Sequence, residues 1–363
     1  MNGVWKTVWL IPMLFLFSCE ERAIDIPESD RLEKIEVAVE GKNYLSSDLF
    51  LDCQVVELET TEDSYLASIG RVYRDGRYLY ILDDRLQSVL LFDTNGRFVR
   101  KIHDLGRGPG EYIQLSDFSI AENGSLLLMA DIPGKVIIRA QDGSLAGQIP
   151  LEKAYMDFCS SGDSLIFLDP PSSKTAFSCL NQITGSISSY QKAIPAYNSF
   201  YIHGRFLTKT NQQILMTRRF DNTVYGVDRH FVKSAEILFK GNKFITESEL
   251  KEYRESPLFF DFCRKNNRVF SIVDCQQLSN VWVFNTNLPY CFLYSSKTGK
   301  QYVVSDIEDQ KNHLHLGGFS RVSINGNTDD QVCFVLREDG LKQLGKSEKD
   351  NPVLVFYTIR KDL

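Results

Sequence analysis

Short hydrophobic runs dominate the chain between residues 70 and 240, where they alternate with turn residues. Hydrophobic positions spaced as on one face of a helix are almost absent there. Short apolar runs bounded by Gly, Pro, Asn and Asp are typical of β-strands. The pattern therefore predicts an all-β architecture built from many short strands.

The strand pattern repeats along the chain. An Asn-Gly turn at Gly96 and an Asp-Gly turn at Gly143 close hairpins of similar sequence, 47 residues apart. Both dipeptides favour the positive φ angles that tight hairpins need. Related units end near Gly185, His230 and Gly299. Because units of roughly 40 to 50 residues with four strands each are typical of propeller blades, the repeat predicts five blades.

The fifth unit ends 69 residues after the fourth, which leaves room for an insert. Thr246 and Glu249 have the spacing of a capping box, and Pro257 ends the helical pattern that follows. The sequence therefore predicts a short helical insert near residues 246–263 that packs beside a blade.

The sixth unit is split between the two ends of the chain. Three strand-like runs lie near the C-terminus, at residues 321–324, 331–336 and 352–358. The run at residues 55–58 has no partner in the first unit, whose four strands are supplied by residues 71–102. We expect it to complete the sixth blade, since joining the two ends leaves no open sheet edge. The predicted fold is a six-bladed β-propeller closed by an N-terminal strand.

Residues 1–18 have the layout of a lipoprotein signal peptide. Lys6 precedes an apolar run that Pro12 interrupts and that is too short to span a bilayer. The run ends in Leu-Phe-Ser-Cys, which resembles a bacterial lipobox and predicts a lipid on Cys19. An ordinary secretory signal with a chance cysteine is the alternative.

The polar stretch after Cys19 predicts a lipid-anchored tether over residues 19–50. Residues 51–363 would then form the propeller domain, which we expect to be monomeric. Two or more acyl chains on Cys19 would attach this domain stably to a membrane.

The remaining seven cysteines contain no C-x-x-C pair, so the sequence indicates neither a zinc ribbon nor a thioredoxin-like site. Cys179, Cys291 and Cys333 lie in strand-like runs and are predicted to be buried thiols. Disulfide pairing stays open for an exported chain.

Charge argues against nucleic acid as a partner. The chain has 41 Lys and Arg against 47 Asp and Glu, a net charge of −6, and no basic block stands out. Proteins that bind nucleic acid carry a basic patch, so we expect no such interaction.

Two motifs carry a resemblance to a known family. Residues 92–98 read FDTNGRF and residues 106–112 read GRGPGEY. Together with the lipobox and six blades, they make the chain similar to the six-bladed β-propeller lipoproteins of gut-type bacteria, which relate to NHL-repeat propellers. The resemblance implies the fold and a lipid-anchored place in the cell envelope, at the outer membrane, on either its periplasmic or its surface side.

The glycine-rich motif is also the candidate ligand-binding segment. Arg107, Glu111 and Tyr112 are the candidate contacts, and Arg107 could grip a carboxylate or sulfate with its guanidinium fork. The segment lacks the Lys-Ser/Thr ending of a P-loop, so a structural connection between blades is the competing interpretation. Aspartates 83, 131 and 169 recur at one blade position and are predicted to accept hydrogen bonds from turns.

No catalytic residue and no metal site is assigned from the sequence. His313 and His315 share one face of an extended segment, but no third ligand lies near them. The predicted function is a non-enzymatic binding or protein-interaction module for a glycan, a peptide or an envelope protein, with no cofactor. The alternative is a propeller hydrolase or lyase that acts on polysaccharide or lactone substrates with channel carboxylates and calcium.

Overall fold

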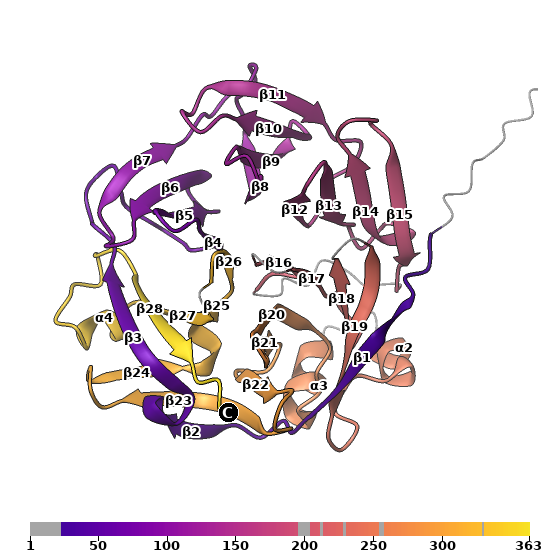
Figure 1. Cartoon of the computed structure of the whole chain (residues 1–363), viewed down its shortest axis with the longest axis vertical. Helices are drawn as coiled ribbons and strands as arrows, with labels where there is room; N and C mark the ends of the chain where they lie inside the picture. The colour runs from indigo at the N-terminus through magenta and orange to yellow at the C-terminus, as the bar shows by residue number, and fades with distance from the viewer. Residues whose placement is uncertain (1–22, 195–203, 211–212, 228–229, 254–257, 329) are drawn as a thin grey trace, which may run out of the picture.

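Six blades surround a central axis, as Figure 1 shows. The computed structural model describes residues 23–194, 204–210, 213–227, 230–253, 258–328 and 330–363. Within each blade, neighbouring strands pair antiparallel, and they follow one another from the centre of the ring to its rim. The prediction of an all-β six-bladed propeller is confirmed.

The first three blades follow the chain in order. Blade 1 contains β4 (Arg71–Arg74), β5 (Tyr78–Asp83), β6 (Ser88–Asp93) and β7 (Phe98–Ile102). Blade 2 contains β8 (Gln114–Ile120), β9 (Leu126–Ile132), β10 (Lys135–Arg139) and β11 (Leu145–Pro150). Blade 3 contains β12 (Asp157–Ser161), β13 (Ser164–Leu168), β14 (Thr175–Asn181) and β15 (Ile187–Lys192).

The other three blades carry additions. Blade 4 contains β16 (Leu207–Lys209), β17 (Ile214–Met216), β18 (Thr223–Val227) and β19 (Phe231–Phe239). Blade 5 contains β20 (Ile272–Leu278), β21 (Val281–Thr286), β22 (Cys291–Ser295) and β23 (Gln301–Asp309), on which β24 (Leu314–Gly317) pairs. Blade 6 contains β25 (Arg321–Val322), β27 (Gln331–Leu336), β28 (Val353–Ile359) and the N-terminal β3 (Phe50–Glu57). Short elements join them: η1 (Gly318–Ser320), β26 (Ile324–Gly326) and α4 (Asp339–Lys342).

The turn glycines and the ring closure agree with the sequence. Gly96 and Gly143 have φ angles of +88° and +91°, the left-handed values that their hairpin turns require. Strand β3 pairs antiparallel with β28, from Val353 opposite Glu57 to Ile359 opposite Phe50. The predicted exchange of an N-terminal strand into the last blade is therefore confirmed.

Apolar contacts between neighbouring blades form the core. Each of the six blade-to-blade interfaces holds one buried cluster, for example Leu82 and Val89 of blade 1 against Phe118 and Leu128 of blade 2. The seven described cysteines are all free. Cys291 and Cys333 are buried as predicted, whereas Cys179 is only half-buried.

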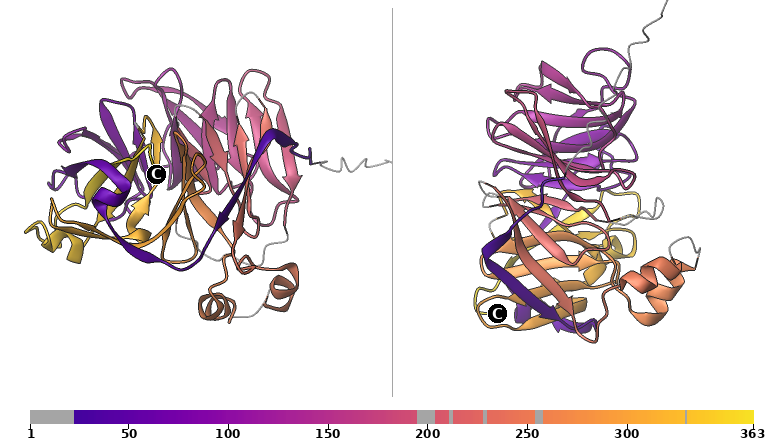
Figure 2. Two further views of the ribbon diagram at one scale, coloured as in Figure 1. Left: turned by 60° about the horizontal axis from the view of Figure 1, so that its bottom comes forward. Right: turned by 90° about the vertical axis from the view of Figure 1, so that its right-hand side faces the viewer.

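The insert consists of two helices rather than one. Helix α2 (Glu247–Tyr253) begins at the predicted capping box, where Thr246 N donates to Glu249 Oε2 at 2.9 Å and Glu249 N to Thr246 Oγ1 at 3.2 Å. Helix α3 (Phe259–Asn266) buries Phe259 and Cys263 beside blades 4 and 5. Figure 2 shows both helices projecting beside the ring. In the described part of the chain, no helix has the length and hydrophobicity to cross a membrane.

The segment predicted as a tether is bound to the rim from its first described residues onward. Strand β1 (Glu28–Val37) pairs in parallel with β19, β2 (Lys42–Leu45) pairs in parallel with β23, and α1 (Ser46–Leu49) leads into β3. Figure 2 shows this belt crossing the outside of the ring. The prediction that the tether extends to residue 50 is wrong, because Ile35 and Val37 alternate with charged residues and their side chains are fully buried.

We predict that Ile35→Ala lowers the free energy of unfolding by about 2–5 kcal/mol, because it leaves a cavity beneath β1. Glu36→Ala, at the neighbouring exposed position, is the matched control and should change it by less than about 0.5 kcal/mol. Urea titration followed by the fluorescence of Trp282, whose indole Nε1 donates to Glu33 at 2.8 Å, measures both. Equal stability of the two variants would mean that β1 is not part of the cooperative fold.

Candidate functional site

The central channel is closed at one end. Inner strands of opposite blades meet there, as Thr210 after β16 forms a parallel bridge with Gly326 of β26. Lys209 N donates to Asn325 Oδ1 at 2.6 Å, and Lys209 Nζ donates to Ser160 O at 2.6 Å. Strand β26 in turn pairs in parallel with β4, so the bridge links blade 4 to blade 1 across the centre of the ring.

The other end of the channel holds a cavity of about 560 Å³. Its lining comes from two kinds of segment: the first parts of inner strands with the residues just before them, and the loops that follow the second strands of blades 1, 4 and 6. The bridge lies at the other ends of the inner strands. Five arginines and four acidic residues line the cavity: Arg71, Arg85, Arg205, Arg219 and Arg337, and Asp84, Asp157, Asp274 and Glu338. This is a concave site of the size that ligands use in proteins.

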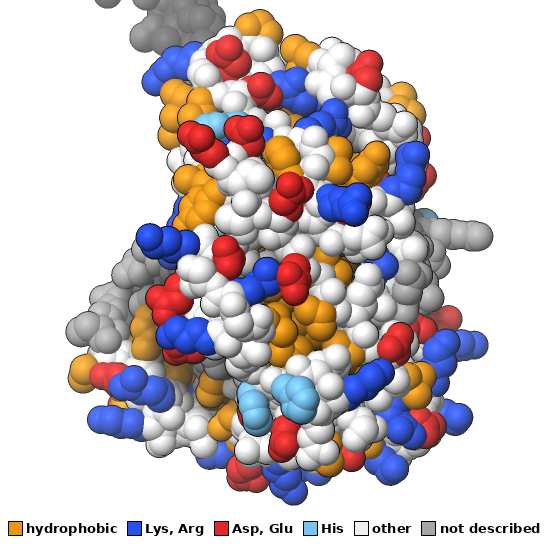
Figure 3. Space-filling view, turned by 90° about the vertical axis from the view of Figure 1, so that its left-hand side faces the viewer, with side chains coloured by type: hydrophobic (Ala, Val, Ile, Leu, Met, Phe, Trp, Pro, Cys, Tyr) orange, Lys and Arg blue, Asp and Glu red, His pale blue; other side chains and the backbone are white. Residues whose placement is uncertain are grey.

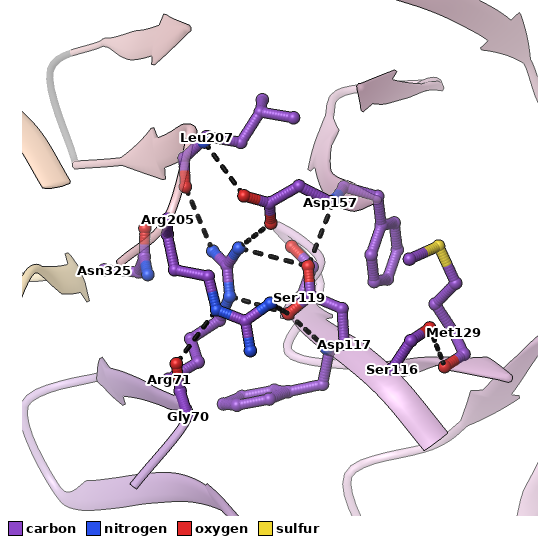
Figure 4. Close-up of polar contacts among 12 residues, drawn as sticks. Gly70, Arg71, Ser116, Asp117, Ser119, Met129, Asp157, Arg205, Leu207 and Asn325 are labelled. Atoms are coloured by element: carbon purple, nitrogen blue, oxygen red, sulfur yellow. Dashed lines mark hydrogen bonds and ion pairs between the residues drawn. The ribbon is translucent and has the colours of Figure 1, made fainter. Parts of the chain in front are cut away.

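Arg71, the first residue of β4, forms the floor of this cavity and is 4% exposed. Figure 4 shows its guanidinium between two carboxylates. Nε lies 2.7 Å from Asp117 Oδ1 in β8, and Nη2 donates to Asp117 Oδ2 at 3.1 Å and to Asp157 Oδ1 in β12. Nη1 donates to the carbonyl oxygen of Leu207 in β16 at 3.3 Å. One side chain therefore contacts blades 2, 3 and 4 from blade 1.

Backbone N–H groups donate the remaining hydrogen bonds to both carboxylates. Asp157 Oδ2 accepts from the N–H groups of Phe206 and Leu207, each at 3.0 Å. Asp117 accepts from the N–H groups of Phe118 at 2.8 Å and Phe158 at 3.0 Å. Each carboxylate oxygen is thus paired, as burial of a charge demands.

Burial and the nearby guanidinium groups shift the pKa values of the two carboxyl groups in opposite net directions. Burial raises the pKa of Asp117, and the positive charges of Arg71 and Arg205 offset this rise only in part. Burial acts on Asp157 as well, but Arg71, Arg205 and hydrogen bonds outweigh it and hold its pKa below the usual range.

Arg205 presents part of its guanidinium to the cavity. Its Nε donates to the carbonyl oxygen of Gly70 at 2.9 Å, and its Nη1 lies 3.9 Å from Asp117 Oδ1. A Cβ on Gly70 would stand 3.2 Å from Arg205 Nη2 and 3.3 Å from Asp84 Cγ. Gly70 thus keeps open the space between a guanidinium and a carboxylate. Among the described residues, neither Arg205 Nη2 nor Asp84 Oδ2 has a hydrogen-bond partner.

Backbone strain accompanies the cavity wall. Asp274 has φ of +51° and Glu338 has φ of +42°, both unusual for residues with a side chain. Asp274 is held in place by Ser323 Oγ, which donates to its Oδ1 at 2.7 Å. Such strain persists where the surrounding structure over-determines it, and it concentrates at functional sites.

The candidate contacts from the sequence lie outside this cavity. Glu111 Oε2 accepts from Gly108 N at 2.8 Å, and Tyr112 is buried with its hydroxyl donating to Gln87 O at 2.8 Å. The segment connects blade 1 to blade 2, which is the structural interpretation raised above. Tyr112 is buried and Glu111 is engaged within its own loop, whereas Arg107 is exposed. Ligand binding by these three residues stays a prediction.

Two further expectations concern single residues. Asp83 Oδ1 accepts from the N–H groups of Arg85 at 3.0 Å and Leu86 at 2.9 Å, which confirms the prediction for this aspartate. Asp169 accepts from side-chain hydroxyl groups instead. His313 and His315 are exposed, and the described residues contain no group of three or more His, Cys, Asp or Glu positioned to hold a metal ion.

The sequence contained one unused signal for the cavity floor. Asp117-Phe118 and Asp157-Phe158 are identical dipeptides 40 residues apart, close to the blade repeat. Both begin the buried part of an inner strand. Arg71 and Arg205 have no comparable signature, because the contacts that define their role come from other blades.

Fold and cavity together define a six-bladed β-propeller with a polar cavity at one end of its central channel. The chain belongs to the family described as Domain of unknown function (DUF4934), whose model matches residues 32–358. Comparison with curated proteins gave no match.

Two solved structures are similar to this one. The first is a protein from Bacteroides fragilis NCTC 9343 that is described as exported, with 20% identity, a TM-score of 0.72, and coverage of 91% of this chain and 100% of that chain. The second is a member of the DUF4221 family from Bacteroides vulgatus ATCC 8482, with 10% identity, a TM-score of 0.53, and coverage of 86% and 97%. At these identities the likeness shows the fold.

We predict that Arg71→Met lowers the free energy of unfolding by about 3–5 kcal/mol, because it leaves two buried carboxylates without their cation. Arg85→Met is the control, since that side chain is exposed at the same cavity. It should change the free energy of unfolding by less than about 0.5 kcal/mol. Urea denaturation at neutral pH measures the difference. A mild effect of Arg71→Met would show that the network is dispensable for stability.

Proposed function

We propose that the protein is a non-enzymatic binding module of the cell envelope and that the central cavity holds its ligand, a glycan or a peptide. The observation that carries the proposal is the pair formed by Arg205 Nη2 and Asp84 Oδ2 on either side of Gly70. The pair offers a donor and an acceptor that no described residue uses. Sugar hydroxyls and peptide groups both donate and accept hydrogen bonds, so either ligand complements it.

Preorganisation supports the same site. Arg205 is fixed by Gly70 O and Asp117, and Asp84 by Ser68 Oγ, so little side-chain freedom is lost on binding. The volume of about 560 Å³ suits a short segment of a chain rather than a whole domain.

The arrangement of the aspartates favours binding over catalysis. A hydrolase or lyase needs a carboxyl group oriented toward the substrate to donate a proton or to attack. Asp117 and Asp157 direct their oxygens to Arg71 and to backbone N–H groups instead. The enzyme alternative would therefore depend on Glu338, Asp84 and Asp274. Hydroxyl groups of Ser68 and Ser323 donate hydrogen bonds to the two aspartates.

The envelope location rests on two observations. The similar protein from Bacteroides fragilis is described as exported, and residues 1–18 have the layout of a signal peptide. We propose further that Cys19 carries the lipid that anchors the protein in the outer membrane, as in the NHL-like propeller lipoproteins that the sequence resembles.

Binding to glycan and peptide arrays tests the cavity. The mature chain with Cys19→Ala supplies a soluble probe, and we expect Arg205→Met to weaken its array signals at least tenfold, the equivalent of about 1.4 kcal/mol. Arg107→Ala is the matched control from the glycine-rich loop and should leave the signals unchanged. Loss with Arg107→Ala alone would move the site to that loop, and processing of an array compound would favour the enzyme alternative.

Membrane attachment has a separate test. Cys19→Ala should move the protein from the membrane fraction to the soluble fraction, because it removes the thiol that carries the acyl chains. Cys53→Ala, in the exchanged strand β3, is the matched cysteine control and should stay with the membrane. Continued membrane association of the Cys19→Ala protein would contradict the lipid anchor.

A further inference from the structure

The chain is fixed to the rim of blade 3 a few residues after Cys19. Ile24 N donates to Ser189 O at 2.8 Å, and Gln191 N donates to Ile24 O at 2.9 Å. These bonds form a parallel bridge between Ile24 and Tyr190 of the outer strand β15. Figure 1 shows β1 starting beside β15 at the rim.

This attachment limits the reach of the proposed anchor. Five residue steps separate Cys19 from Ile24, and an extended residue spans at most about 3.6 Å, so the lipidated end lies within roughly 18 Å of the rim. The ring is wider than this reach, because the four strands of a blade span about 14 Å at a spacing of about 4.8 Å, and two opposite blades together span about 29 Å. A lipid on Cys19 therefore holds the blade 3 edge of the ring close to the bilayer, whereas the opposite edge lies beyond the reach of this segment.

The edge that faces the anchor is apolar at three exposed positions. Ile24 is 51% exposed, Ile187 at the start of β15 is 42% exposed, and Ile183 in the turn before β15 is 76% exposed. Ile183 is the most exposed large hydrophobic residue in the described part of the chain. Exposed apolar side chains beside an acyl anchor add buried area to membrane binding.

We propose that the outer edge of blade 3 docks on the lipid surface through Ile24, Ile183 and Ile187. The proposal rests on the lipid anchor at Cys19. The partner of this surface is the lipid bilayer, because the chain is bound to the rim at Ile24 and only five residue steps separate Ile24 from Cys19. The ring then stands edge-on to the membrane. In this orientation the mouth of the cavity faces sideways, open to ligand rather than pressed against lipid.

Tryptophan quenching by brominated lipids tests the docking. Only Trp282, which is 2% exposed, remains after the signal peptide with Trp5 and Trp9 is removed. A second tryptophan therefore reports its own depth. In the lipidated protein on vesicles of phosphatidylethanolamine and phosphatidylglycerol with brominated acyl chains, we expect strong loss of fluorescence for Ile183→Trp. Leu51→Trp is the matched control, an exposed position on β3 at the opposite rim, and should show several-fold less quenching.

Two further measurements separate the outcomes. Ile187→Ser in the Ile183→Trp protein should reduce the quenching several-fold, and unchanged quenching would mean that the lipid alone brings the rim near, which overturns docking. Mass spectrometry of the mature N-terminus reports the lipid. A lipidated protein whose two tryptophan variants are quenched equally would overturn the docking but keep the anchor, and an unmodified N-terminus would overturn both.

Discussion

The ion network around Arg71 is the interaction on which the rest of the structure depends. Contacts between propeller blades are otherwise mostly apolar and local, since each blade packs against its two neighbours. Arg71 instead reaches from blade 1 to Asp117, Asp157 and the backbone of blade 4. Because a buried guanidinium must be paired, the inner strands of four blades have to bring Arg71 and its partners to the same level. That common level is the floor of the cavity.

Strand pairing also joins the blades along the rim of the ring. Strand β3 completes blade 6, and the belt that precedes it adds β1 to blade 4 and β2 to blade 5. A chain segment that starts at blade 3 thus touches four blades in succession before the first blade begins. A ring held both at its centre and along its rim gives the cavity residues a rigid frame, which is the condition for a preorganised site.

Local signals made the fold predictable, and long-range contacts made the site hard to predict. The Asn-Gly and Asp-Gly turns at Gly96 and Gly143 set the repeat, and the unpartnered run of β3 identified the closure. The belt was not predicted, because Ile35 and Val37 stand among charged residues and the segment is polar on average. The alternation of apolar and charged positions that is typical of a strand covers only a few residues there. Arg71 and Arg205 gain their roles only from groups on other blades. The glycine-rich motif attracted a functional prediction, yet its hydrogen bonds shape a connection between blades.

Charge balance narrows the kind of ligand that the cavity accepts. Five arginines and four acidic residues line it, and Asp117 lies directly beneath, so the described residues of the site carry as many negative as positive groups. The whole chain has a net charge of −6, and Figure 3 shows basic and acidic side chains interspersed on one face of the molecule. A polyanion would therefore meet no extended positive field on that face. Recognition then depends on the geometry of individual hydrogen bonds rather than on long-range attraction. Neutral ligands with many donors and acceptors, such as glycans and peptide segments, match that requirement better than strongly charged ones.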